Sequence, residues 1–129
     1  MKPKLLIVDD STILRETTRG ILESKFSTLR VFEARDGKEA YIQIHDQLPD
    51  LILMDIRLPG ENGLRLTRKI KDSFPKIKII IFTNYDLPEY RQAAFDNGAD
   101  YFLSKSTPNT KKLSTMVESI LADAGFNQL

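Results

Sequence analysis

The chain has 129 residues, 41% of them hydrophobic and 29% charged, which suits one globular domain of roughly 100 to 150 residues and argues against a disordered or fibrous protein. Its 19 basic and 18 acidic side chains give a formal net charge of +1, so no overall charge favours nucleic acid or an anionic membrane. There is no cysteine, which excludes disulfides, thiolate metal sites and cysteine nucleophiles.

The N-terminal sequence contains no targeting or membrane segment. Met-Lys-Pro-Lys leads into a short apolar run that ends at Asp9 and Asp10, which is too short for a signal peptide or a membrane span. We find no linker, repeat or low-complexity segment. We therefore expect a cytoplasmic protein with no membrane contact, folded as a single domain over residues 1–129.

Short apolar runs alternate with longer amphipathic stretches along the chain. This alternation is typical of a parallel β-sheet with helices on both faces. Most of the runs are almost continuously apolar, as expected of strands that are covered on both sides. The candidate strands cover residues 5–8, 29–33, 51–54, 77–82 and 101–103.

Between and after these strands the hydrophobic spacing becomes helical. The last helix is the clearest, with Ser106 or Thr107 as its N-cap and Pro108 in its first turn. Its side chains step by three and one along a single face that would pack against the sheet. This apolar stripe consists of Leu113, Met116, Val117, Ile120 and Leu121.

Turn sequences separate the strands from the helices. Asp36-Gly37 precedes the second helix, Pro59-Gly60 and Asn62-Gly63 precede the third, and Asn97-Gly98 follows the fourth. The sequence therefore predicts an α/β fold with a doubly wound, five-stranded parallel sheet, flavodoxin-like with strand order 2-1-3-4-5, and five helices. Such sheets bind ligands at the carboxyl ends of their strands.

Residues capable of phosphate or metal chemistry follow the predicted strands. Asp9 and Asp10 follow the first strand, Asp55 the third and Thr83 the fourth, and Lys105 comes just after the fifth. In the order 2-1-3-4-5 these four strands are neighbours, so we expect the side chains to converge on one pocket.

Carboxylates gathered in one place repel one another unless a cation neutralises them, and oxygen ligands favour Mg²⁺ or Mn²⁺ over zinc. Asp55 lies centrally and can act as the nucleophile, because aspartyl phosphate is an established kind of covalent intermediate. Lys105 can supply a cation and Thr83 a hydroxyl to the charged oxygens of a phosphoryl group. The pattern therefore predicts metal-assisted phosphoryl transfer to Asp55.

Residues 5–10, 51–63, 80–83 and 97–105 together resemble the signature of response-regulator receiver domains, and the similarity extends over the full chain. The resemblance implies that Asp55 is phosphorylated by a sensor histidine kinase or a phosphotransfer protein. The implied contacts to the phosphoryl group come from Thr83 and Lys105. The implied metal ligands are Asp9, Asp10, Asp55 and the backbone carbonyl of Arg57.

The resemblance also implies how the signal leaves the site. Phe102 matches the aromatic that turns inward when the hydroxyl of Thr83 moves toward the phosphate. We expect the switched surface, and a homodimer contact, at the fourth helix, fifth strand and fifth helix. Arg57 and Tyr85 match positions at the mouth of the site, where we expect them to obstruct the water that hydrolyses the phosphate.

The chain departs from the family directly after Lys105, where Ser106 replaces a common proline that follows a cis bond. The Lys-Ser pair resembles the branch whose receivers precede a helix-turn-helix DNA-binding domain. A receiver cut from such a regulator and a stand-alone receiver both remain open. We expect no direct nucleic-acid binding by this chain, whose basic helical residues lack interleaved aromatics.

Three other functions compete with this interpretation. A flavodoxin-like redox protein would bind flavin mononucleotide on the same topology, but Asp9 and Asp10 would repel its phosphate. A phosphatase with an aspartate nucleophile usually carries an Asp-x-Asp pair after the first strand, whereas these aspartates are adjacent. A degenerate receiver would bind partners without phosphorylation, which the complete set of site residues argues against.

Overall fold

The computed structural model describes residues 2–105 and 110–129. Its main sheet is five-stranded and parallel throughout, with the order β2-β1-β3-β6-β7. Counted along the chain without the short hairpin β4-β5, this is the predicted order 2-1-3-4-5. The sheet strands are β1 (Lys4–Val8), β2 (Arg30–Ala34), β3 (Leu51–Met54), β6 (Lys78–Thr83) and β7 (Tyr101–Ser104).

The strand ends differ slightly from the prediction because pairing decides where a ladder begins. The run 51–54 is a strand over the residues predicted, whereas the runs 29–33 and 77–82 each begin one residue later and extend one further. Leu29 and Ile77 are buried but lie before the paired residues. Burial therefore explains their apolar character, and the neighbouring strand sets the boundary.

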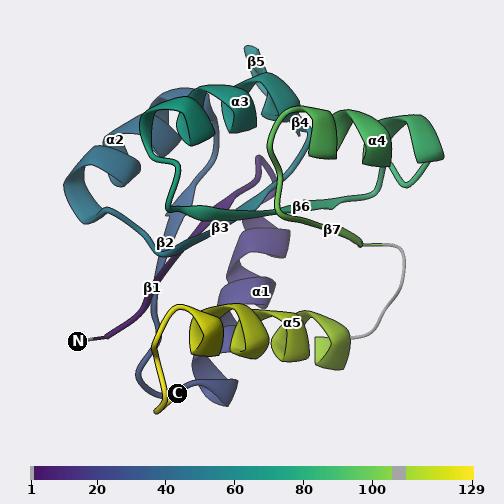
Figure 1. The fold of residues 1–129 in the computed structure, drawn as a ribbon. Helices are drawn as coiled ribbons and strands as arrows, with labels where there is room; N and C mark the ends of the chain where they lie inside the picture. The colour runs from purple at the N-terminus through teal and green to yellow at the C-terminus, as the bar shows by residue number, and fades with distance from the viewer. Residues whose placement is uncertain (1, 106–109) are drawn as a thin grey trace.

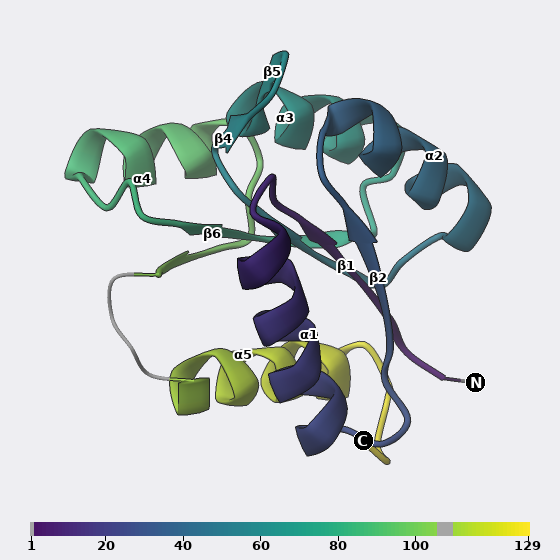
Figure 2. The same ribbon diagram turned by 180° about the vertical axis from the view of Figure 1, so that it is seen from behind.

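The helices cover both faces of the sheet. Figures 1 and 2 show α2, α3 and α4 on one face and α1 and α5 on the other. Among the described residues, no helix combines the length and apolar character needed to cross a membrane. The helices are α1 (Thr12–Lys25), α2 (Gly37–Gln47), α3 (Gly63–Ser73), α4 (Pro88–Asp96) and α5 (Thr110–Asp123).

Each strand feeds two hydrophobic cores because successive side chains point to opposite faces. In β3, Ile52 and Met54 pack with α2, α3 and α4, whereas Leu51 and Leu53 pack with α1 and α5. All of them are almost completely buried. This two-sided burial is the reason for the continuous apolar runs in the sequence.

The turn sequences begin the helices as predicted. Asp36 is the N-cap of α2 and accepts a hydrogen bond from the backbone N–H of Glu39. Asn62 caps α3 in the same way. The predicted cap of the last helix, at Ser106, Thr107 and Pro108, lies outside the described residues.

One element was not anticipated in the loop before α3. A two-stranded antiparallel hairpin, β4 (Arg57–Leu58) and β5 (Glu61–Asn62), encloses the predicted Pro59-Gly60 turn. Gly60 has φ +74°, a left-handed conformation that glycine adopts without steric cost. The hairpin fixes the chain directly after Asp55.

Candidate functional site

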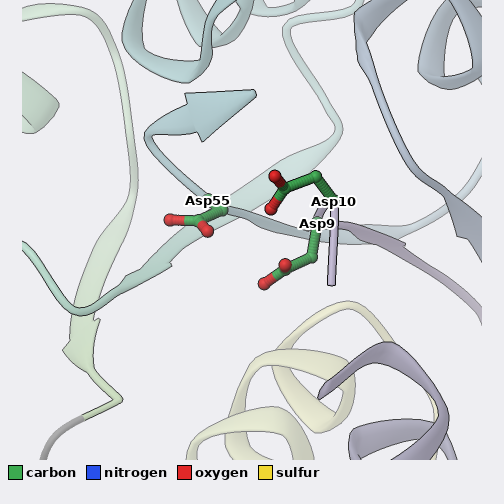
Figure 3. A group of neighbouring side chains, drawn as sticks. All are labelled: Asp9, Asp10 and Asp55. Atoms are coloured by element: carbon green, nitrogen blue, oxygen red, sulfur yellow. The ribbon is translucent and has the colours of Figure 1, made fainter. Parts of the chain in front are cut away.

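The carboxylates at the carboxyl edge of the sheet come from two adjacent strands. Val8 and Met54 are register partners in β1 and β3, so the residues that follow them emerge side by side. The backbone N–H of Asp55 donates to the carbonyl of Val8 at 3.0 Å, and that of Asp9 donates to Ala34 at 3.0 Å. Figure 3 shows Asp9 and Asp10 at the end of β1, with Asp55 beside them.

The three aspartates lie close enough to share one cation. One carboxylate oxygen from each of Asp9, Asp10 and Asp55 lies within 4.8 Å of the others. Asp9 is 3% exposed and Asp55 9%, whereas Asp10 faces solvent. Clustered oxygens with one open side fit a hard divalent cation that retains water ligands.

Lys105 joins this cluster from the end of β7. The backbone N–H of Lys105 donates to the carbonyl of Thr83 at 2.8 Å, which aligns the residue after β7 with the end of β6. Its Nζ contacts Asp9 and lies 3.0 Å from Oδ2 of Asp55, and the side chain is 7% exposed. The ammonium group therefore offsets part of the negative charge of two nearly buried carboxylates. The peptide between Lys105 and Ser106 lies outside the described residues.

Backbone N–H groups hold the remaining carboxylate oxygens. Ser11 donates to Oδ1 of Asp9 at 2.9 Å, and Ile56 donates to Oδ1 of Asp55 at 2.8 Å. The Asp55 oxygen that faces Lys105 is Oδ2. Asp55 lines a hollow of about 420 Å³ together with Asn84, Ile13 and Leu14.

Thr83 and Phe102, the predicted switch pair, lie on the neighbouring strands β6 and β7. Thr83 is fully buried at the end of β6, and its Oγ1 accepts a hydrogen bond from the N–H of Tyr85 at 3.3 Å. Phe102 is 6% exposed, and the guanidinium carbon of Arg91 lies 4.7 Å from its ring centre. The hydroxyl of Thr83 is thus engaged with the loop after β6.

Sequence reasoning missed the close approach of Gly63 to Asp55. A Cβ atom on Gly63 would lie 1.9 Å from the carbonyl oxygen of Asp55. The N–H of Gly63 donates to Ile56 at 2.7 Å, which brings the start of α3 against the loop that carries Asp55. The sequence pattern Asn62-Gly63 predicts only a turn, although a glycine at this position is also a signal of close backbone approach. Asn84 and Ser11 were also missed, because polar loop residues carry no distinctive signal.

The sequence of the chain matches the family model of the response regulator receiver domain over residues 5–118. The chain belongs to this family. The relatives support the response-regulator interpretation and lend no support to the flavin-binding alternative. The fold, the sheet order and the cluster of aspartates agree with this assignment.

Individual relatives define the assignment further. The chain is 40% identical over 111 residues to oxygen regulatory protein NreC of Staphylococcus aureus, and the match covers 85% of this chain but 51% of NreC. The chain thus spans about half the length of the curated relatives it matches.

A CheY-like receiver domain from Methanospirillum hungatei has a TM-score of 0.87 at 29% identity, covering 95% of this chain and 96% of that one. A LuxR-family two-component response regulator from Aurantimonas has a TM-score of 0.87 at 33% identity, covering 95% and 87%. The protein is therefore a receiver domain of a two-component response regulator.

Proposed function

We propose that Asp55 accepts the phosphoryl group in this receiver domain and that residues 1–129 fold as one such unit. The observation that carries the proposal is the position of Asp55, which lines the hollow and whose Oδ2 lies 3.0 Å from Lys105 Nζ. In the proposed step this oxygen attacks the phosphorus of a phosphohistidine. The phosphorus–nitrogen bond breaks, and its electron pair returns to the imidazole of the donor. The domain itself supplies the catalysis.

The proposed metal ligands are the carboxylates of Asp9, Asp10 and Asp55 and the backbone carbonyl of Arg57, with Mg²⁺ or Mn²⁺ as the ion. The clustering of the three carboxylates supports this set. A divalent cation there would neutralise charge on the oxygens of the phosphoryl group. The ammonium group of Lys105 contacts Asp9 and Asp55. On phosphorylation it would transfer a hydrogen bond from these carboxylates to the oxygens of the phosphoryl group.

Thr83 is proposed as the other contact to the phosphoryl group. Its hydroxyl now accepts from the N–H of Tyr85, so a turn toward Asp55 would release the loop that follows β6. Phe102 lies on the adjacent strand, packed in the same core as α4. We propose that this pair carries the signal to the surface of α4, β7 and α5, where a second copy or another partner would bind.

In the full-length protein we propose a sensor histidine kinase or phosphotransfer protein as donor and a helix-turn-helix output domain as target. The share of about half that the match covers in the curated relatives supports a further domain beside the receiver. This chain itself would then make no direct contact with nucleic acid. We also predict a cytoplasmic location, because such kinases draw their phosphoryl group from ATP.

The test is incubation with a small phosphodonor and Mg²⁺, followed by mass spectrometry of the intact protein. The wild type should gain one phosphoryl group and Asp55→Asn none. Asp72→Asn, an exposed substitution on α3, is the matched control and should be labelled like the wild type. Equal labelling of Asp55→Asn would refute the acceptor assignment, and no labelling of the wild type would favour a degenerate receiver.

The metal ligands are tested separately by calorimetric titration. Asp10→Ala should lose Mg²⁺ affinity without losing stability, because Asp10 is exposed and its removal relieves carboxylate repulsion. The metal-free variant should unfold at the same temperature as the wild type or slightly above it. Equal Mg²⁺ affinity in the two proteins would remove Asp10 from the ligand set.

A further inference from the structure

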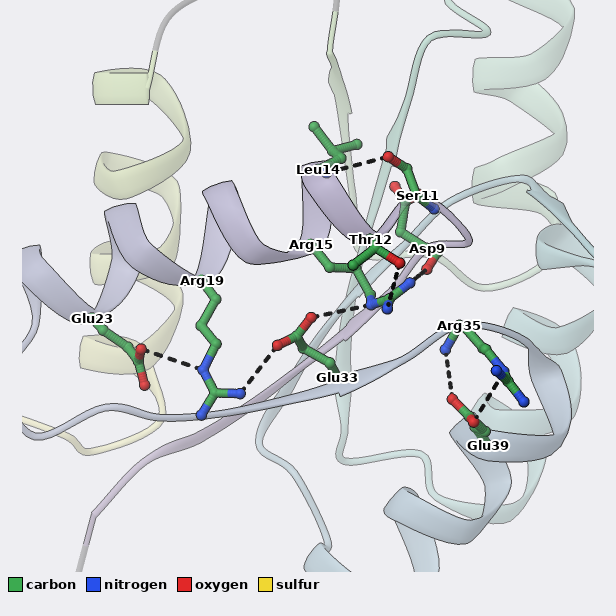
Figure 4. A network of polar contacts seen from close by, with 10 residues as sticks. All are labelled: Asp9, Ser11, Thr12, Leu14, Arg15, Arg19, Glu23, Glu33, Arg35 and Glu39. Carbon is green, nitrogen blue, oxygen red and sulfur yellow. Dashed lines mark hydrogen bonds and ion pairs between the residues drawn. The ribbon is translucent and has the colours of Figure 1, made fainter.

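The backbone carbonyl of Asp9 is held by an arginine from the first helix. Nη1 of Arg15 donates to this oxygen at 2.6 Å, and the Nε of the same guanidinium lies 3.1 Å from Oε1 of Glu33 on β2. The Arg15 side chain is 13% exposed. Figure 4 shows the guanidinium between Glu33 and the end of β1.

This carbonyl belongs to the peptide that joins the two neighbouring carboxylate residues. The peptide unit is planar, so fixing the direction of the Asp9 carbonyl also fixes the Asp10 N–H and the path by which Asp10 leaves Asp9. Two further hydrogen bonds anchor Asp9: its N–H donates to the carbonyl of Ala34, and its carboxylate accepts from the N–H of Ser11. Asp10 is exposed, so its direction depends strongly on the peptide that precedes it.

Glu33 orients the guanidinium and also pairs with a second arginine. Arg19 lies 3.1 Å from Oε2 of Glu33 and 3.3 Å from Glu23, and the hydrogen bond to Glu33 raises the pKa of Arg19 above its ordinary value. Figure 4 places Arg19 further along α1, away from Asp9. The two arginines therefore share one carboxylate partner, but Arg15 is the one that reaches the site.

We propose that Arg15, oriented by Glu33, is a positioning residue that directs the carboxylates of Asp9 and Asp10 toward Asp55. The inference rests on the proposed metal site. It assigns to Arg15 no contact with the ion or with the phosphoryl group. Groups that orient metal ligands in this way typically change affinity by roughly 10-fold to 100-fold when they are removed.

The sign of the effect separates positioning from simple electrostatics. Arg15 carries a positive charge next to a cation site, so charge alone predicts that its removal strengthens Mg²⁺ binding. Positioning predicts the opposite, because Asp9 and Asp10 would then have to be ordered when the ion binds. An ion pair that served stability alone would change the unfolding temperature and leave ligand geometry intact.

The experiment compares Arg15→Met with Arg19→Met. Both substitutions keep an apolar stem of similar shape, and Arg19→Met removes the other partner of Glu33. Mg²⁺ affinity is measured by calorimetric titration, and amide hydrogen exchange of residues 10 and 11 is measured without metal. Arg15→Met should bind Mg²⁺ at least about tenfold more weakly and exchange faster at these amides. Arg19→Met should match the wild type in both measurements, whatever its unfolding temperature.

Arg15→Lys keeps the charge but cannot hold Glu33 and the Asp9 carbonyl with one planar group, so its affinity should also fall. This variant replaces Arg15→Met if the latter does not fold. Unchanged or tighter Mg²⁺ binding in the folded Arg15 variants would overturn the inference. Absence of Mg²⁺ binding by the wild type would instead overturn the proposed metal site, so the two failures are distinguishable.

Discussion

The guanidinium carbon of Arg57 lies 4.5 Å from the ring centre of Tyr85, so β4 is joined to the loop after β6 by a cation–π contact. Tyr85 also meets Tyr90 of α4 edge to face, with ring centres 5.6 Å apart. These contacts hold two broad side chains, Arg57 and Tyr85, on the segments that follow Asp55 and Thr83. Neither side chain can act as a general base. Such contacts are worth about 0.5–1 kcal/mol at exposed sites, enough to favour one arrangement.

We therefore expect slow loss of the phosphoryl group from the wild type. Hydrolysis needs a water in line with the phosphorus–oxygen bond, and neither Arg57 nor Tyr85 is a natural base to orient it. The double variant Arg57→Asn, Tyr85→Glu should dephosphorylate several-fold faster, measured as loss of label under the same Mg²⁺. Arg65→Asn on α3 is the control for a lost surface charge. An equal or slower rate in the double variant would refute the shielding argument.

Lys105 should be essential for stability without metal and less so with it. Lys105→Met leaves the nearly buried carboxylates of Asp9 and Asp55 without their shared cation, which should cost roughly 3 kcal/mol of unfolding free energy. Mg²⁺ should recover part of this loss by neutralising the same carboxylates. Thermal unfolding of both proteins with and without Mg²⁺ tests this, and a deficit that Mg²⁺ does not reduce would contradict it.

Gly63 should tolerate no side chain, because a Cβ there would overlap the carbonyl of Asp55. Gly63→Ala should lower the free energy of unfolding by roughly 1–3 kcal/mol and displace the loop that carries Asp55. The control is Gly20→Ala in α1, where a Cβ meets no atom within 4 Å. That change should raise stability by about 0.5–1 kcal/mol. Denaturant unfolding should give opposite signs for the two, and the same sign would contradict the packing argument.

Phosphorylation should alter hydrogen exchange in α4 and β7. Arg91 of α4 covers the ring of Phe102 in β7 and pairs with Asp86 at 3.4 Å, so release of the loop after Thr83 should loosen these contacts. Arg91→Ala should speed exchange in α4 before phosphorylation and reduce the further change on phosphorylation. Arg65→Ala on α3 serves as the control. A change confined to residues 10–20 would contradict this route.

Much of the fold and the cluster of carboxylates could be predicted from local patterns. The run 51–54 is apolar throughout because both faces of β3 are covered, so it indicated a strand and its depth in the sheet. Asp9, Asp10 and Asp55 were predicted to meet because parallel strands end at one edge. Two features could not be predicted. Strand pairing set the exact ends of the strands, and the short strands of the β4-β5 hairpin carry no periodic signal.

The sequence by itself determined which residues form strands and which chemical groups follow them, because both depend on the chain order and on short hydrophobic patterns. Only the tertiary structure decided how those groups are held. Lys105 reaches Asp9 across 96 residues of chain, Arg15 turns back to the Asp9 carbonyl, and Gly63 lies against Asp55. These contacts depend on loop paths and side-chain directions. Packing between elements far apart in the chain sets both, so a local pattern indicates at most that such residues meet and not which atoms touch.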